Sequence, residues 1–429
     1  MKTILVESHA VGWVHLNVVL RSGALHDPAG AEGTAYLASQ MLVRGTKRRT
    51  REQFDEALDA MGAELDVSVG RESVVLEGEV LSRNLDRFVA LLGEALREPA
   101  MDPDELGLLV RLTQAELEQV RDSDADLCGD LFARHMWGPH PFGRPVKGTE
   151  STVGAIRQGD VAAFSQRHVA APNVLIAAAG DVTRPHLDAL LHEHLGSLDG
   201  PVPAEPPLGG LGHGAGVRVL LVDKPERSQT QVRWGHPCIA AGDPDYFPLM
   251  VGNTIFGGTF TSRLMQEIRE KRGWSYGAYS RLFTDRRTGG VVMSYYPAAE
   301  DTVPALALGQ QLFGDLVEHG VTDDELAFTK SFLVNGFPFQ VETPARRMWQ
   351  LAQIELLGRP ADFLDTWVER VSSLTRDEVN RALRTHLHPD HLALAVVCTA
   401  EPLRDAIAAL PGVRSVRTVP YDAEWSDPA

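Results

Sequence analysis

The spacing of hydrophobic positions predicts both helices and strands in the first half of the chain. From Pro103 to Asp122, apolar side chains recur every three or four residues, which places them on one face of a helix. Further helices are predicted from Thr50 to Met61, where Thr-x-x-Gln forms a capping box, and from Asn84 to Arg97. The segments LDVSVG and SVVLEGEV have the patterns of strands. This mixture predicts an α+β fold, with helices covering a mostly antiparallel sheet.

A segment rich in proline and glycine divides the chain nearly in half. Between Leu195 and Val217 the helical periodicity stops and bulky apolar residues become scarce, as in a linker. The two halves end alike, with FSQRHVAAPNVLIAAAGDVTRPHLDALLHEHLGSL and VNRALRTHLHPDHLALAVVCTAEPLRDAIAALPGV, which both predict a helix, a loop, a strand, a turn and a helix. The sequence therefore predicts two homologous domains, residues 1–198 and 217–429, joined by a linker of residues 199–216.

Composition and charge narrow the class of partner. The chain has 429 residues, 44% of them hydrophobic, and a formal net charge of −17, and we interpret its Lys and Arg residues as scattered. This balance predicts a soluble globular protein that does not bind nucleic acid. The acidic surface serves either solubility alone or the attraction of basic peptides.

The cysteines and the N-terminus bear on the cellular compartment. Cys128, Cys238 and Cys398 lie far apart without CxxC spacing, so we expect reduced thiols and neither a zinc knuckle nor a disulfide framework. The N-terminal MKTILVESHAVGW lacks the pattern of a signal peptide, and no later stretch reaches the length of a membrane span. A cytoplasmic protein without a membrane partner is the expectation.

The stretch GTAYLASQMLVRGT, from Gly33 to Thr46, has the spacing of a metal-binding helix without its ligands. In the inverted zinc motif HxxEH, two histidines on one helix face bind zinc, and the glutamate activates the metal-bound water. The stretch resembles the zinc helix of the pitrilysin-like peptidases, which include the mitochondrial processing peptidases and whose run is close to GxAHFLEHMLFKGT. By this resemblance Tyr36 and Gln40 occupy the histidine positions and Ser39 that of the catalytic glutamate. Glu116 falls where the last ligand belongs.

These substitutions predict that the chain itself binds no metal and carries no cofactor. One carboxylate does not hold zinc, and a tyrosine hydroxyl or a neutral amide is not a usual zinc ligand. Glu116 is then expected to be a solvated or locally hydrogen-bonded carboxylate, and Ser39 lacks a histidine at helical spacing that could activate it. A second metal candidate in THLHPDH, formed by His386, His388 and His391, has no carboxylate or cysteine at ligand spacing. We interpret these three as surface histidines.

The second half contains the segment FGGTFTSRLMQEIREKRGWSYGAYS. Its pattern predicts a helix from Asp245 to Ile255, a flexible FGGTF turn, a helix beginning at Ser262 and an aromatic strand, SYGAYS. The turn and REKRGWSYG resemble the same family, in which an arginine and a tyrosine at this spacing point at the zinc site of the opposing domain.

The resemblance implies roles for five residues of this segment. Arg269 and Tyr276 would stabilise the tetrahedral intermediate of amide hydrolysis in a partner's site. The turn residues Gly257, Gly258 and Thr259 would contact the substrate. From the residues alone, the alternative is that Arg269 pairs with a neighbouring acid such as Glu267 or Glu270, and that Tyr276 belongs to the core.

The resemblance extends from about Val14 to about Val397 and implies that two domains form half of a clam-shell chamber. It also implies that MKTILVESH matches the family's second strand, with the first strand missing. We hypothesise a non-zinc subunit of a heterodimeric peptidase, whose homologous HxxEH-bearing partner holds the zinc and which cleaves unfolded peptides or leader segments. The alternatives are a non-catalytic peptide-binding or structural core subunit and, less favoured, a homodimeric peptidase. In isolation the chain could also form a homodimer.

Overall fold

The computed structural model describes residues 1–210 and 214–423, and its chain divides into two compact units. Unit 1 comprises residues 1–118, 144–208 and 339–356, and unit 2 comprises residues 119–143, 209–338 and 357–429. The predicted boundaries at 198 and 217 differ from this division. The reason is that each half of the sequence contributes one helical segment to the unit formed mainly by the other half.

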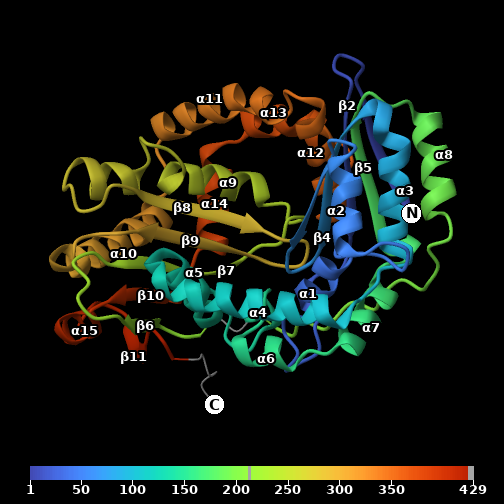
Figure 1. Cartoon of the computed structure of the whole chain (residues 1–429). Helices are drawn as coiled ribbons and strands as arrows, with labels where there is room; N and C mark the ends of the chain where they lie inside the picture. The colour runs from blue at the N-terminus through green and yellow to red at the C-terminus, as the bar shows by residue number, and fades with distance from the viewer. Residues whose placement is uncertain (211–213, 424–429) are drawn as a thin grey trace. The chain divides into compact units, whose positions relative to one another are not determined.

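Unit 1 is built on a five-stranded sheet with the strand order β1-β5-β2-β4-β3 (Figure 1). β1 and β5 are parallel, and all other neighbouring strands are antiparallel. The edge strands are therefore β1 and β3. The strands are β1 (Lys2–Glu7), β2 (Trp13–Leu20), β3 (Glu64–Val69), β4 (Val74–Leu81) and β5 (Val174–Gly180).

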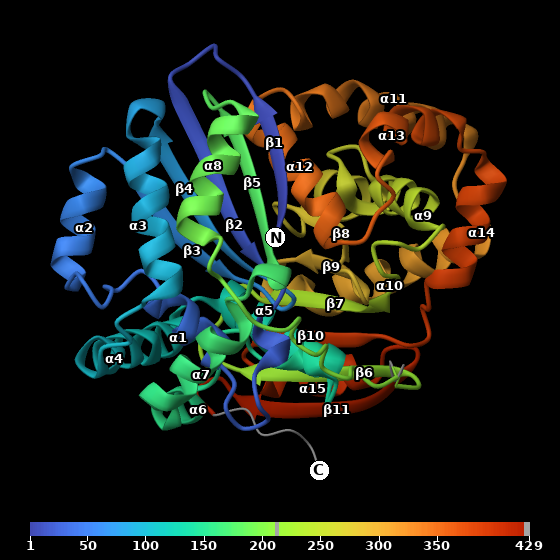
Figure 2. The same ribbon diagram turned by 90° about the vertical axis from the view of Figure 1, so that its right-hand side faces the viewer.

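Helices cover both faces of this sheet. Because side chains alternate along β2, Leu16 and Val18 enter the main core on one face, where α3 and α8 lie over the strands (Figure 2). On the opposite face, Val19 packs with Met348 and Ala352 of α12 (Pro344–Leu356), which comes from the second half of the sequence. The helices that contribute to the main core are α1 (Thr34–Met41), α2 (Arg51–Asp59), α3 (Leu85–Arg97), α4 (Pro103–Gln119), α6 (Glu150–Ala155), α7 (Gln158–His168) and α8 (Arg184–Leu195).

Two of the predicted helix starts in unit 1 are confirmed. Thr50 Oγ1 accepts a hydrogen bond from Gln53 N (3.3 Å) and Gln53 Oε1 accepts one from Thr50 N (3.0 Å), so the capping box is complete and α2 begins at Arg51. α4 begins at Pro103 as predicted but ends at Gln119 and continues as a 3₁₀ turn over Val120–Asp122.

Unit 2 is built on a six-stranded sheet with the order β11-β6-β10-β7-β9-β8. Trp234 of β7 packs against Phe313 of α10, with ring centroids 5.5 Å apart. The neighbouring Arg233 lies against Gly129 of α5, where an added Cβ would come within 2.5 Å of the guanidinium. Consecutive strand residues face opposite sides, so α10 and α5 cover opposite faces. The strands are β6 (Val217–Asp223), β7 (Gln231–Cys238), β8 (Ala278–Thr284), β9 (Gly289–Tyr295), β10 (Ala393–Cys398) and β11 (Val413–Pro420).

The helices of unit 2 complete the architecture. α14 packs on α9 and α10, and α5 comes from the first half of the sequence, in the way that α12 comes from the second. Their bounds are α5 (Asp124–Trp137), α9 (Tyr246–Asn253), α10 (Thr302–His319), α11 (Asp323–Gln340), α13 (Phe363–Ser373), α14 (Arg376–His386) and α15 (Glu401–Ala408).

The two sheets repeat one topology. The order β1-β5-β2-β4-β3 matches β6-β10-β7-β9-β8 strand for strand. The pairs β1–β5 and β6–β10 are parallel, and the other neighbours in these two orders are antiparallel. This confirms the α+β class with mostly antiparallel sheets. β1 corresponds to β6, the first strand of the second half. The match of Met1–His9 to the family's second strand stays a prediction.

Cys128, Cys238 and Cys398 are free thiols, of which two are buried and Cys238 is half-buried. Burial raises the pKa of each thiol to about 12. At neutral pH they are protonated and poor nucleophiles or metal ligands. Within residues 1–210 and 214–423, no helix combines the length and the apolar character needed to cross a bilayer.

Candidate functional site

Helix α1 carries the degenerate zinc motif, and the buried Asp27 fixes its start. The Asp27 carboxylate accepts hydrogen bonds from the backbone N–H groups of Gly33 (2.8 Å) and Ala35 (2.7 Å). Burial nevertheless raises the pKa of Asp27 to about 7, against the effect of these two bonds. Gly33 has a φ of +99°, a conformation that a residue with a side chain rarely adopts. This clamp sets the orientation of the helix face that follows.

Tyr36 and Gln40 lie one turn apart on α1 but make different contacts. Tyr36 is half-buried against the main core. Gln40 Nε2 donates a hydrogen bond to the Val67 carbonyl of the edge strand β3, at 3.0 Å. Ser39 is 2% exposed, and its Oγ makes no hydrogen bond within the part of the chain that the structure describes. Ser39 therefore lacks a base that could activate it as a nucleophile.

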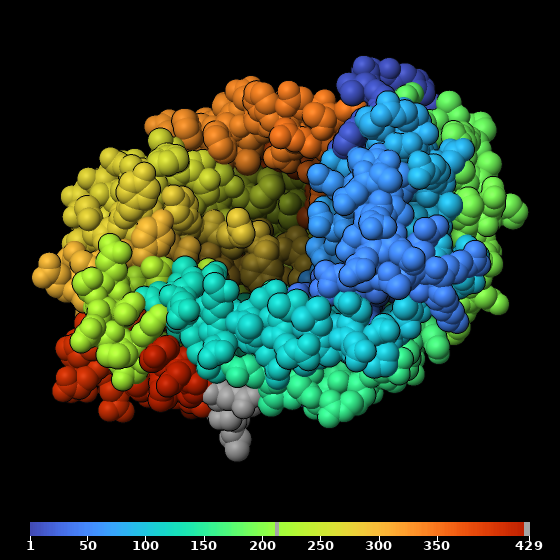
Figure 3. All heavy atoms as spheres, viewed as in Figure 1, coloured from blue at the N-terminus to red at the C-terminus, as the bar shows by residue number. Residues whose placement is uncertain are grey.

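Lys147 lies between Tyr36 and Glu116, two of the positions compared above with zinc ligands, and the sequence reasoning missed it. Its Nζ is 2.8 Å from Glu116 Oε2 and 5.5 Å from the centroid of the Tyr36 ring, within the range of a cation–π contact. Glu116 lies half-exposed on α4, whose atoms are cyan in Figure 3. Glu116 is thus a half-exposed carboxylate whose hydrogen-bond partner lies 31 residues away in the sequence. Nothing in FGRPVKGTE marks this lysine, because only folding bridges the 31 residues between it and Glu116.

The protonation states at this position follow from its surroundings. Burial by itself lowers the pKa of Lys147, but the hydrogen bond with Glu116 and the nearby Tyr36 leave that pKa above its ordinary value. Burial raises the pKa of Tyr36, and Lys147 offsets part of that rise. At neutral pH Lys147 is thus an ammonium and Tyr36 a neutral phenol.

In unit 2, Arg269 and Tyr276 come together at the sheet edge formed by β8. The Arg269 guanidinium carbon lies 5.3 Å from the centroid of the Tyr276 ring and 5.2 Å from that of Phe260. Tyr276 is 80% exposed and Phe260 is 67% exposed, so the alternative that Tyr276 belongs to the core is wrong. The Tyr276 hydroxyl makes no hydrogen bond to another described residue. Arg269 also pairs with Glu270 at 3.5 Å, as the other alternative proposed.

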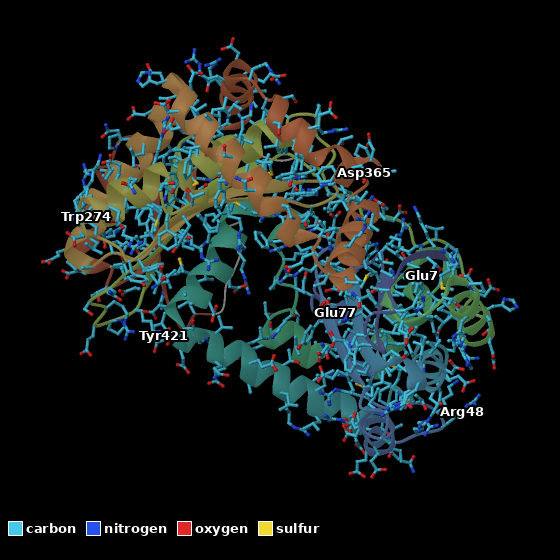
Figure 4. The ribbon with its side chains drawn as sticks, turned by 90° about the horizontal axis from the view of Figure 1, so that it is seen from above. Glu7, Arg48, Glu77, Trp274, Asp365 and Tyr421 are labelled. Atoms are coloured by element: carbon cyan, nitrogen blue, oxygen red, sulfur yellow. The ribbon has the colours of Figure 1, made fainter. Side chains whose placement is uncertain are left out.

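The segment that carries this pair is held by local bonds. The helix expected to begin at Ser262 is present, with Gln266 N donating to the Ser262 carbonyl (2.9 Å), and it continues as a π-helical turn over Met265–Glu270. In the loop that follows, marked by Trp274 in Figure 4, Ser275 Oγ donates to the Gly277 carbonyl (2.7 Å) and accepts from Tyr296 N (3.0 Å). The residues on both sides of Tyr276 are thereby fixed, while its ring projects into solvent.

The FGGTF turn begins as a second π-helical turn, Thr254–Gly258. Gly257 is buried, and an added Cβ there would lie 2.3 Å from Ser280 N of β8. The backbone at Gly257 therefore packs closely against β8 of its own unit. Gly258 and Thr259 are more accessible, and Thr259 Oγ1 lies 3.2 Å from Thr261 Oγ1.

Comparison with known proteins relates this architecture to one family. Residues 2–150 match the family described as insulinase (peptidase family M16), and residues 155–333 match the peptidase M16 inactive domain. The chain belongs to this pitrilysin-like peptidase family. An uncharacterized zinc protease of Streptomyces coelicolor is 27% identical over 87% of this chain and 81% of its own length, and one of Mycobacterium tuberculosis is 28% identical over 91% and 88%. A solved peptidase M16 inactive domain from Pseudomonas fluorescens has a TM-score of 0.83 and 25% identity, covering 92% of this chain and 94% of that one.

The α1 positions of this pitrilysin-like chain do not fit zinc. Zinc sites in proteins use thiolates, imidazoles and carboxylates that are free to coordinate. Here Tyr36 is a protonated phenol, the Gln40 amide is committed to a backbone carbonyl, and Glu116 is paired with an ammonium. The chemistry of the donor set thus agrees with the loss of the HxxEH pattern.

The histidine cluster near the C-terminus has a carboxylate partner that its sequence spacing hides, which corrects our interpretation. His386 Nε2 lies 2.8 Å from Asp245 Oδ2, and Asp243 is close enough to complete a potential three-ligand group. Arg381, however, already binds Asp245 with both terminal nitrogens, at 2.6 and 2.8 Å. The hydrogen bonds with Arg381, followed by that with His386, lower the pKa of Asp245 to about 2. The group is an ion-pair network rather than a metal site.

The Lys and Arg residues are not all scattered, which corrects a second expectation. Five of the eight residues from Arg44 to Arg51 are basic, and they line a cavity of about 400 Å³. Carboxylates of α3, α4 and the nearby chain offset most of this charge, so the segment does not form a free anion site. The ion pairs are Arg44 and Arg51 with Glu105, Arg48 with Glu98, and Arg49 with Glu94.

The uncovered face of β3 and β4 is acidic. In the register of this pair Glu64 lies opposite Glu79 and Asp66 opposite Glu77, on the face away from the main core (Glu77 is labelled in Figure 4). Like charges directly opposite one another destabilise a sheet. β3, which carries two of these carboxylates, is an edge strand, so its outer backbone groups have no strand partner within the sheet.

Proposed function

We propose that this chain is the non-zinc subunit of a heterodimeric zinc peptidase. In this proposal a homologous HxxEH-bearing subunit holds the zinc and closes with this chain into a clam-shell chamber, and Arg269 and Tyr276 complete the partner's active site. The substrates are unfolded peptides or leader segments. Membership of the peptidase family and the unsuitable donors of α1 support this assignment.

The observation that carries the proposal is the exposed Arg269–Tyr276 pair. An arginine held between two largely exposed rings, next to a phenol without an internal partner, contributes little to the stability of unit 2. The bonds of Ser275 nevertheless fix the loop beneath it. A fixed loop that presents a free phenol and a guanidinium is suited to a ligand outside the unit.

The chemistry of these groups matches amide hydrolysis. The partner's HxxEH motif would hold a zinc ion that supplies activation of water for amide hydrolysis, a reaction in which negative charge develops on the oxygen of the peptide carbonyl. A phenol hydroxyl can donate a hydrogen bond to that oxygen, and a guanidinium can anchor the backbone carbonyls of the peptide. Gly258 and Thr259 are the accessible part of the turn that we assign to substrate contact, while the buried Gly257 holds the turn against β8.

The acidic face of β3 and β4 supports a basic peptide as the substrate class. Asp66 lies on the edge strand β3, and Glu77 and Glu79 lie on its neighbour β4. An extended peptide can add to an edge strand by backbone hydrogen bonding. Neutralisation by Lys or Arg side chains would relieve the repulsion between opposed carboxylates.

The deciding experiment compares this chain alone, its HxxEH-bearing homologue from the same genome alone, and the two mixed. Zinc content is measured by elemental analysis, and cleavage is followed with matched basic and acidic fluorogenic peptides. The proposal expects zinc in the homologue, cleavage only in the mixture, and faster cleavage of the basic peptide.

Two results would count against the proposal. If the two chains never associate, or if the homologue cleaves equally well without this chain, the alternative of a non-catalytic peptide-binding or structural subunit is favoured. Cleavage by this chain alone as a homodimer would instead support the third hypothesis. Analytical ultracentrifugation of each sample separates these cases.

A further inference from the structure

The backbone around Lys147 is built to bring this side chain to α1. Gly33 at the start of α1 leaves so little room that an added Cβ would lie 2.6 Å from the Lys147 carbonyl oxygen. The next residue, Gly148, has a φ of +80°, and an added Cβ there would lie 2.2 Å from the Glu32 carbonyl oxygen. Two glycines therefore permit a close contact between the two chain segments.

Further bonds hold this contact in place. Thr152 Oγ1 donates a hydrogen bond to the Glu32 carbonyl at 2.8 Å, and it caps α6 through the backbone N–H of Thr149 (2.9 Å). Lys147 thus enters the site from a segment anchored just before α6, not from a free loop. Its ammonium is placed between Tyr36 and Glu116 by the fold of unit 1 itself.

We propose that Lys147 is a resident cation that takes the place of the metal ion in unit 1, compensating the Glu116 charge and opposing metal binding. This inference does not depend on the proposed heterodimer. Restoring the two histidines alone therefore gives a weak zinc site, and removal of the Lys147 ammonium is also needed for tight binding.

The expected size of the effect follows from exposure. Lys147 and Glu116 are 45% and 50% exposed, so the flexible lysine can swing into solvent when a metal competes for the carboxylate. A metal ion that binds Glu116 must then break the partly screened Lys147–Glu116 ion pair, and the displaced ammonium still repels it. We expect zinc affinity to rise about tenfold on removal of the ammonium, rather than a change from no binding to full binding.

The test restores the two histidine ligands and varies only the lysine. One chain carries Tyr36→His and Gln40→His, a second adds Lys147→Met, and a matched control adds Lys2→Met instead. Lys2 is also a half-exposed lysine in an ion pair of unit 1, with Glu355 of α12, on the face of the sheet away from the main core. Ser39 is left unchanged, because a glutamate at this buried position would endanger folding.

Zinc affinity is measured by competition with a chromophoric chelator, and Co²⁺ absorption reports tetrahedral coordination. Circular dichroism verifies the fold of each variant. The proposal expects the Lys147→Met chain to bind about tenfold more tightly than the other two. Equal affinity in all three chains, including failure of all three to bind zinc, would overturn it, as would an equal gain from Lys2→Met.

Discussion

Substitution of Tyr276 by Phe isolates the hydroxyl that we assign to catalysis. The ring remains, so its contact with Arg269 at 5.3 Å is kept. The hydroxyl makes no hydrogen bond to a described residue and the side chain is 80% exposed, so the free energy of unfolding should change by less than about 0.5 kcal/mol. Loss of a hydrogen-bond donor to the oxyanion is expected to lower kcat roughly ten- to a thousandfold, which corresponds to about 1.4–4 kcal/mol.

The assay measures kcat and KM of the mixed subunits with a fluorogenic peptide, and assembly is followed by ultracentrifugation. Tyr421→Phe is the matched control, because Tyr421 follows β11, at the edge of the unit 2 sheet opposite β8. We expect the control to retain normal kcat and Tyr276→Phe to lose kcat with little change in KM. Unchanged kcat in a normally assembled Tyr276→Phe complex would refute the assigned role.

Two further predictions concern stability. Gly257→Ala places a Cβ 2.3 Å from Ser280 N and should lower the free energy of unfolding by about 2 kcal/mol. The control Gly314→Ala in α10 meets no atom within 4 Å and should be neutral or stabilising by up to about 1 kcal/mol. Urea titration measures both variants, and equal changes in the free energy of unfolding would contradict the packing argument. The pKa of Asp245 falls from 3.8 to about 2 on folding, chiefly through Arg381, so its stabilising contribution is complete above about pH 4 and is lost as the pH falls towards 2. Unfolding measured from pH 5 to 2 should therefore depend less on pH in Arg381→Met than in the parent chain, and identical slopes would show that the ion pair is too exposed to matter.

Much of the candidate site was readable from local sequence, within limits that the structure explains. The resemblance singled out Arg269 and Tyr276, and the structure brings their side chains together because a turn and a short loop are enough to connect them. The degenerate positions on α1 were readable for the same reason, since residues three and four apart share a helix face. Lys147 was missed because its partner Glu116 and the Tyr36 ring meet it only in the folded unit. Likewise, the bond of His386 to Asp245 joins residues 141 positions apart.

The sequence by itself determined the elements and their repetition. Apolar periodicity and capping residues identified α2, α3 and α4, because these signals act within one or two turns of a helix. Only the tertiary structure decided which elements share a unit. Residues 119–143 and 339–356 each lie in the unit built mainly by the other half, because α5 and α12 bury their apolar sides on the second faces of those sheets. Burial of apolar surface does not depend on position in the chain, and hence no local pattern could reveal this exchange.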